Sequence, residues 1–75
     1  MANLKLLNEA IESKGIKKGF IAQKMNIERT TFRKKLLGQS PITSDEIAVL
    51  KAVLNLSSDE VDNIFFTAEV TDSNI

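Results

Sequence analysis

The sequence predicts an all-α fold, a compact five-helix bundle. Apolar residues recur at intervals of three and four in five segments, and no segment alternates apolar and polar residues as a strand does. The chain contains only one proline and three glycines, so the ends of these segments are identified mainly from helix-capping residues. At 75 residues the chain has room for one small domain, which we place at residues 1–66, and a short frayed or extended C-terminal tail at 67–75.

Two helices are predicted before residue 27. Apolar side chains three and four apart predict a helix at 3–14, and Gly15 is suited to end it. A second helix is predicted at about 18–25, with Phe20 among its inward residues. Asn26 tolerates the left-handed conformation of a tight turn, so a short turn leads to the next helix.

A third helix is predicted at about 28–37. Phe32 and Leu36 are four residues apart on its inner face, and Gly38 follows as a terminator. All four phenylalanines of the chain are expected in the core rather than as stacking platforms, because large aromatic rings are usually buried. They are Phe20, Phe32, Phe65 and Phe66.

The last two helices share one pair of start signals. Each begins with Ser or Thr followed three residues later by Glu, which is a capping box, and apolar residues flank the box as a staple. One helix is predicted at 43–54 and the other at 58–66, where Val61 and Ile64 face inward with Phe65. The boxes pair Thr43 with Glu46 and Ser57 with Glu60.

The net charge of zero hides two oppositely charged halves. Residues 1–40 contain nine basic and three acidic residues, a net of +6, whereas residues 41–75 contain one basic and seven acidic residues, a net of −6. The stretch from Lys14 to Lys35 contains eight basic residues and one acid, a net of +7. Such asymmetry indicates a surface for a polyanion. A solvated basic face is the alternative, and the acidic half either keeps the protein soluble or docks a basic partner.

Several function classes lack the residues that they need. Without cysteine or histidine the chain has no disulfide, no thiolate or imidazole metal ligand and no imidazole base, so we expect no cofactor, no metal and no enzymatic activity. Apolar runs reach four residues at most, too short to span a bilayer, and the start of the chain lacks a signal-peptide layout. We therefore expect a cytoplasmic protein that binds neither a membrane nor a small molecule.

Two groups of side chains in the basic stretch have the chemistry of a DNA contact. Lys17 and Lys18 stand at the start of the second helix, where the helix dipole makes each cation unfavourable by roughly 0.3–1 kcal/mol and a phosphate would remove that cost. The outer face of the third helix has no acid after Glu28, and it presents donors and threonine methyl groups suited to base edges. The side chains of that face are Arg29, Thr30, Thr31, Arg33 and Lys34.

Residues 19–38, GFIAQKMNIERTTFRKKLLG, resemble the helix-turn-helix of the Xre family, the class of the lambdoid phage repressors and Cro proteins. The Ile-Ala pair of the second helix, the Asn of the turn, the Ile after it and the final Gly are in register with the family pattern. Residues 54–66 resemble the family's closing helices, so the likeness covers about residues 3–66. The sequence departs from the pattern at positions where the family has Gln, a capping residue or an apolar residue. These departures are Lys17, Lys18, Glu28 and Lys35.

The resemblance implies a lambda repressor-like DNA-binding domain with a helix-turn-helix motif at about 18–37. Its recognition helix, 28–37, would lie in the major groove of double-stranded DNA. The matching positions assign base reading to Arg29, Thr30 and Lys34, with Arg33 in addition. The expected phosphate-binding residues are Lys17, Lys18, Thr31, Gln39 and Ser40.

The implied function is that of a sequence-specific transcriptional regulator, Cro-like or a minimal phage or prophage-type repressor, nucleoid-associated in a bacterial cytoplasm when bound to DNA. We expect a homodimer on a two-fold operator, held together by the helix 58–66 and the tail through Phe66 and Val70. The alternative is a protein-interaction module on the same fold, an antirepressor or adaptor, in which the acidic C-terminal half binds the partner.

Overall fold

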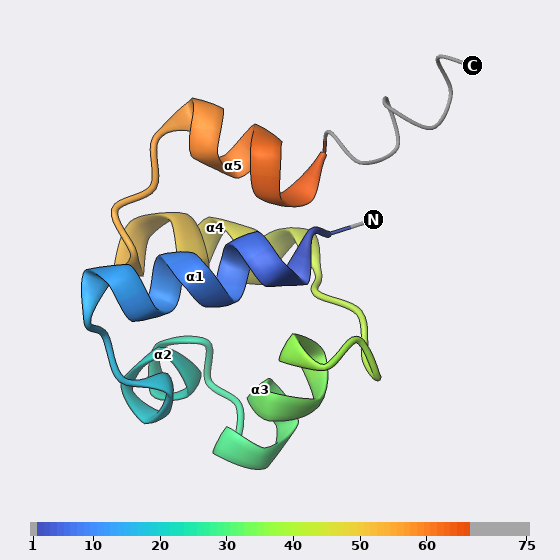
Figure 1. Ribbon diagram of the computed structural model, residues 1–75. Coiled ribbons are helices and arrows are strands. Elements are labelled where there is room, and N and C mark those ends of the chain that lie inside the picture. Colours follow the sequence, from blue (N-terminus) through green and yellow to red (C-terminus); the bar gives the residue numbers. More distant parts are fainter. Residues whose placement is uncertain (1, 67–75) are drawn as a thin grey trace.

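The computed structural model describes residues 2–66, which form five helices and no strand (Figure 1). This confirms the predicted all-α class, and each helix begins and ends within one residue of its predicted bounds. The predicted tail at 67–75, with Val70, lies outside the described residues. The helices are α1 (Leu4–Lys14), α2 (Lys18–Lys24), α3 (Arg29–Leu36), α4 (Ser44–Val53) and α5 (Ser58–Phe65).

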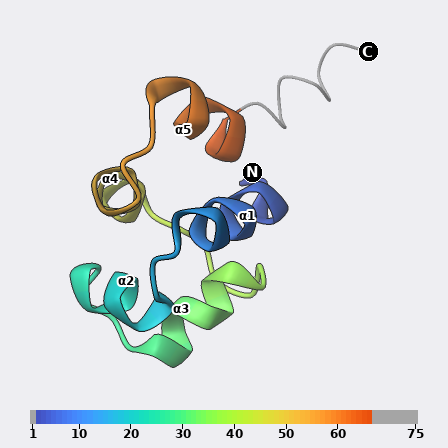
Figure 2. The same cartoon turned by 60° about the vertical axis from the view of Figure 1, so that its left-hand side comes forward.

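The first helix, α1, lies between the basic helices and α5. It packs against α3 and α5, and α2 packs against both α3 and α4. Figures 1 and 2 show α2 and α3 together at one end of the molecule, α1 and α4 in the middle and α5 at the opposite end. The two basic helices are therefore gathered on one side of the fold.

Twelve buried apolar side chains form the core, and every helix contributes to it. Phe32 is the largest of the fully buried side chains, and burial of a side chain of this size stabilises the fold by about 1.5–3 kcal/mol. Leu36, Ile64 and Phe65 are buried as predicted, while Val61 is only partly buried. The inner face of α3 is thus the one that the spacing of its apolar residues indicates.

The prediction that all four phenylalanines lie in the core is wrong for two of them. Phe20 is 47% exposed, because its neighbours Ile21 and Ala22 take the inward positions of α2. Its ring lies 5.3 Å from the Nζ atom of Lys24, a cation–π contact on the outer side of this helix. Phe66, one residue beyond α5, is 50% exposed.

The helices differ in how they begin. Asn3 caps α1, since its Oδ1 atom accepts a hydrogen bond from the backbone N–H of Leu6, and both predicted capping boxes are present at the starts of α4 and α5. In contrast, the cap residues of α2 and α3, Lys17 and Glu28, accept no hydrogen bond from the backbone through their side chains. The first backbone N–H groups of the two basic helices are therefore left without a side-chain partner at the cap.

Left-handed residues follow the ends of four helices among residues 2–66. Gly15, Asn26, Gly38 and Asn55 have φ angles of 68°, 60°, 82° and 53°, and the first three are at the places predicted above. In the connection between α2 and α3, the backbone N–H of Ile27 donates to the carbonyl of Ala22 over 3.0 Å. This bond closes the end of α2 and fixes the direction in which the chain enters α3.

Candidate nucleic-acid interface

A basic cleft of about 280 Å³ lies between the start of α2 and α3. Its lining includes three cations and no acid, with Lys18 from α2 and both Arg29 and Arg33 from α3. Thr30 lies on its rim, and Phe32, fully buried, anchors this part of α3 in the core. The cleft therefore presents several positive hydrogen-bond donors to one small volume, an arrangement suited to an anion.

The structure brings together four of the nine predicted DNA-contact residues at this cleft: Lys18, Arg29, Thr30 and Arg33. Lys17 is exposed at the cap of α2, next to the cleft in sequence, and Lys34 is exposed on α3. Thr31 is half-buried, so it offers less of its surface to a partner. The outer face of α3 and the start of α2 together form one basic surface.

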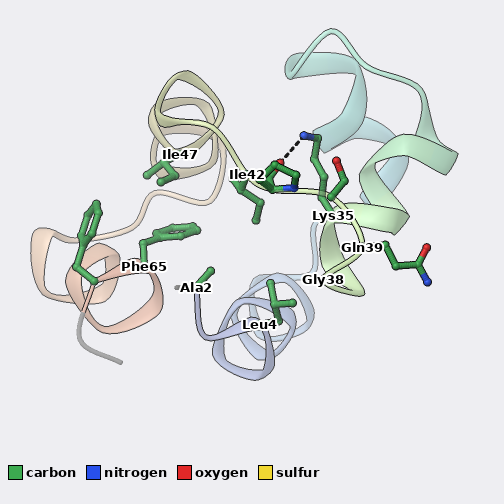
Figure 3. Close-up of a pocket in the computed structure, with 11 residues that line it drawn as sticks. Ala2, Leu4, Lys35, Gly38, Gln39, Ile42, Ile47 and Phe65 are labelled. Carbon is green, nitrogen blue, oxygen red and sulfur yellow. Dashed lines mark hydrogen bonds between the residues drawn. The ribbon is translucent and has the colours of Figure 1, made fainter. Parts of the chain in front are cut away.

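Gln39 and Ser40 do not line the basic cleft. They border a different hollow, an apolar groove of about 530 Å³ beside the connection between α3 and α4. In Figure 3 the side chain of Gln39 points away from that groove, outward from the fold. Apolar side chains from α1, α4, α5 and the adjoining loops form most of the groove wall: Ala2, Leu4, Ile42, Ile47, Phe65 and Phe66.

Arg29 lies back against α2 instead of extending freely from α3. A Cβ atom placed on Gly19 would be 3.4 Å from the Cδ atom of Arg29 and 3.6 Å from its Nη1 atom. Arg29 also borders a second hollow, on the side of Gly19, Ala22 and Gln23. Its side chain thus separates this hollow from the basic cleft.

Lys35 belongs to the basic stretch of the sequence, but it is buried and does not lie on the basic surface. It is 6% exposed, and its Nζ atom donates a hydrogen bond of 2.7 Å to the carbonyl of Pro41 (Figure 3). The same atom lies 3.0 Å from Oε1 of Glu46. This is the only ion pair among residues 2–66. The signal that could have found it is the position of Lys35, on a side of α3 where an apolar residue is usual.

The remaining seven cations of the stretch 14–35 are all exposed, and within residues 2–66 none of them forms an ion pair. Repulsion between such cations is relieved when a polyanion binds them. These exposed cations are Lys14, Lys17, Lys18, Lys24, Arg29, Arg33 and Lys34, of which all but Lys14 lie on α2, on α3 or at the start of α2.

Two acids of the C-terminal half have lowered pKa values because they are already engaged. Partial burial acts to raise the pKa of Glu46, but the hydrogen bond from the backbone N–H of Thr43 and the charge of Lys35 lower it by more. The pKa of Glu60 is lowered chiefly by the hydrogen bond from the backbone N–H of Ser57. Both carboxylates therefore serve the helix caps, which leaves fewer acids for a partner surface.

Residues 2–66 hold no cluster of His, Cys, Asp or Glu that could bind a metal ion. Over the same range no helix combines the length and the hydrophobicity that crossing a membrane requires. Comparison of the chain with protein-family models, with curated proteins and with solved structures gave no match.

Proposed function

We propose that this protein is a sequence-specific regulator that binds double-stranded DNA, with α2 and α3 acting as a helix-turn-helix and α3 entering the major groove. The observation that carries the proposal is the basic cleft between α2 and α3, with three cations and no acid in its lining. A bacterial cytoplasmic protein of the Cro-like or minimal repressor kind fits this surface. The function requires no cofactor, metal or catalytic step.

The exposed face of α3 is suited to reading bases. Thr30, Arg33 and Lys34 are exposed on it and supply donors for guanine and a methyl group for thymine. Lys17 and Lys18, with the half-buried Thr31, are suited to the sugar-phosphate backbone. The loop residues Gln39 and Ser40 extend this backbone contact past the end of α3.

The buried pair of Lys35 and Glu46 supports the proposal through its effect on α3. It joins the end of α3 to the first turn of α4, while Phe32 fixes the same helix in the core. A helix held at both points presents its outer residues in one fixed orientation. Base reading depends on such preorganisation, because each donor must meet one base edge.

The proposal includes a homodimer on a two-fold operator. Its support is the exposed ring of Phe66, which borders the apolar groove at the end of α5. A second copy covering this surface would remove the ring from water. Sedimentation equilibrium should show dimers, and Phe66→Asp should shift the protein to monomers. A wild-type protein that remains monomeric at high concentration, with and without DNA, removes the dimer from the proposal.

Gel-shift titration with duplex DNA tests the function. At ~50 mM salt the protein should bind a random duplex and bind more tightly a duplex selected from a random pool, with log affinity falling by about 0.9 per phosphate contact for each tenfold rise in salt. Lys18→Ala should weaken binding to all duplexes alike. Lys34→Ala should also relax the preference at one base pair, at a cost of roughly 1–3 kcal/mol.

The matched control is Lys51→Ala, which removes an exposed cation from α4 in the acidic half. It should leave the affinity for both duplexes nearly unchanged. Absence of any binding to random duplex at ~50 mM salt would reject the DNA-binding function and favour the adaptor, in which the acidic half binds a basic protein.

A further inference from the structure

Gly19 occupies a position in α2 where the backbone does not require glycine. It lies in the first turn of the helix, and its φ angle is outside the left-handed region that favours glycine. Glycine weakens a helix relative to alanine, and at this position it leaves the surface of α2 open to a neighbouring side chain. The only atoms that a Cβ would meet within 4 Å belong to the side chain of Arg29.

The space above Gly19 holds the stem and one guanidinium nitrogen of Arg29. The Cδ atom lies 3.4 Å and the Nη1 atom 3.6 Å from the place of the missing Cβ. A side chain that reads a base edge must extend away from its helix into the groove. Arg29 packs over Gly19 of α2 instead, and together with Lys18 it lines the basic cleft.

We infer that Gly19 is a positioning residue for Arg29, and that Arg29, with Lys18, binds a phosphodiester group of the duplex instead of a base edge. The inference rests on the proposed function and changes the role that the sequence assigned to Arg29. A guanidinium offers two parallel donors to a phosphate, and the neighbouring ammonium adds charge without a fixed direction. The lining of the basic cleft contains no acid, and the one acid near Arg29 is the exposed Glu28, which lines the second hollow.

Arg29→Ala tests the phosphate role in the full chain. The affinities for a duplex selected from a random pool and for a random duplex should both fall about eightfold at 0.1 M salt, and the salt slope should decrease by about 0.9. The ratio of the two affinities should stay the same. A relaxed preference at one base pair with an unchanged salt slope would overturn the inference and leave the proposed function standing.

Gly19→Leu tests the positioning role. A side chain beyond Cβ should displace Arg29, so this variant should lose as much affinity and salt slope as Arg29→Ala, and it should have no further effect when Arg29 is already alanine. Ala52→Leu is the matched control: it adds the same side chain at an exposed position of α4 that lines neither the basic cleft nor the hollow beside Gly19, so affinity should be retained.

A normal affinity of Gly19→Leu, or a loss that adds to that of Arg29→Ala, would overturn the positioning role. Should Gly19→Leu lose the helical circular dichroism of the wild type, Gly19→Gln, which is polar and also extends beyond Cβ, takes its place with the same criteria. Binding of the wild-type protein to duplex at ~50 mM salt tests the proposed function separately from the roles of Gly19 and Arg29. Its absence rejects the proposed function itself, whereas the variant outcomes concern only Gly19 and Arg29.

Discussion

Lys35 has a structural role that its neighbour Lys34 does not share. Lys34 is exposed, whereas the ammonium of Lys35 is buried between the carbonyl of Pro41 and the carboxylate of Glu46. A buried charge is tolerated when its partners are in place, but loss of one partner leaves the other uncompensated. The stability of the α3–α4 connection therefore depends on the charge of Glu46.

Glu46→Gln should lower the free energy of unfolding at pH 7 by roughly 1–3 kcal/mol, because the buried ammonium of Lys35 would lose its opposing charge and keep only neutral acceptors. Urea denaturation followed by circular dichroism measures this. Glu60→Gln is the matched control, since Glu60 has the same place in a capping box but no buried cation beside it. Equal losses in the two variants would contradict the role given to Lys35.

The same variant should show a distinct pH dependence. The folded protein holds the pKa of Glu46 below its ordinary value of 4.5, so the stabilisation is fully present above that pH and is lost as pH falls through the lowered pKa. The difference in stability between wild type and Glu46→Gln should therefore narrow below about pH 4.5. A difference that stays constant into the acid range argues against a charged interaction.

At the scale of the helix, the two basic elements lack the side-chain caps that the other three possess. Asn3, Thr43 and Ser57 each accept a backbone hydrogen bond, while Lys17 and Glu28 do not. A missing cap costs a helix about 1 kcal/mol relative to Ser or Asp. If the proposed function is correct, the uncapped starts of α2 and α3 lie where the backbone of DNA would approach, and the stability that a cap would add is absent at these two places.

Lys17→Ser should raise the stability of the protein by about 1 kcal/mol and lower its affinity for every duplex. The extended conformation of residue 17, with φ −74° and ψ 139°, allows a serine to cap α2, and the loss of the cation removes a phosphate contact. Thermal denaturation and gel-shift titration measure the two effects.

Glu28→Ser is the control that separates the gain in stability from the loss of DNA affinity. It adds a cap to α3 at a residue with similar backbone angles, φ −76° and ψ 155°, but it removes no cation. Stability should rise as for Lys17→Ser, while affinity for DNA should not fall. If Lys17→Ser gains stability and keeps full affinity, Lys17 makes no phosphate contact.

The helix bounds could be predicted because local signals determine them. Capping boxes are read from two residues three apart, and Gly15 and Gly38 end helices through their own backbone conformations. The facing of Phe20 could not be predicted in the same way. Because α2 has only seven residues, or about two turns, its apolar spacing does not define one buried face. The spacing therefore does not decide whether Phe20 or its neighbour Ile21 is buried.

Contacts between elements account for the rest of what the sequence did not indicate. The pairing of Lys35 with Glu46 joins two helices through a loop, and no local pattern encodes such a bond. The sequence predicts individual site residues, but which of them lie together depends on how α2 and α3 pack. That packing gathers Lys18 with Arg29 and Arg33 and leaves Gln39 beside a different hollow.

At the scale of the whole molecule, the zero net charge reflects a separation of charge between two ends. Six exposed cations lie at the caps or on the turns of α2 and α3, where the one exposed acid is Glu28. All the acids of α5 lie at the other end, since Figures 1 and 2 place α5 beyond α1 from the basic helices. On the proposed function this asymmetry turns the basic end toward DNA and limits the affinity for random sequences. The acids would act through the field of the molecule rather than through contacts.

Asp62→Lys tests this field effect because Asp62 is exposed on α5, away from its first turn. The affinity for random duplex should rise at ~0.01 M salt, where the Debye length is about 30 Å, and the gain should vanish at ~0.15 M, where it is about 8 Å. The preference for a selected duplex over a random one should not improve at either salt. A gain that persists at ~0.15 M would mean that α5 itself touches DNA, which would contradict the orientation proposed for the domain.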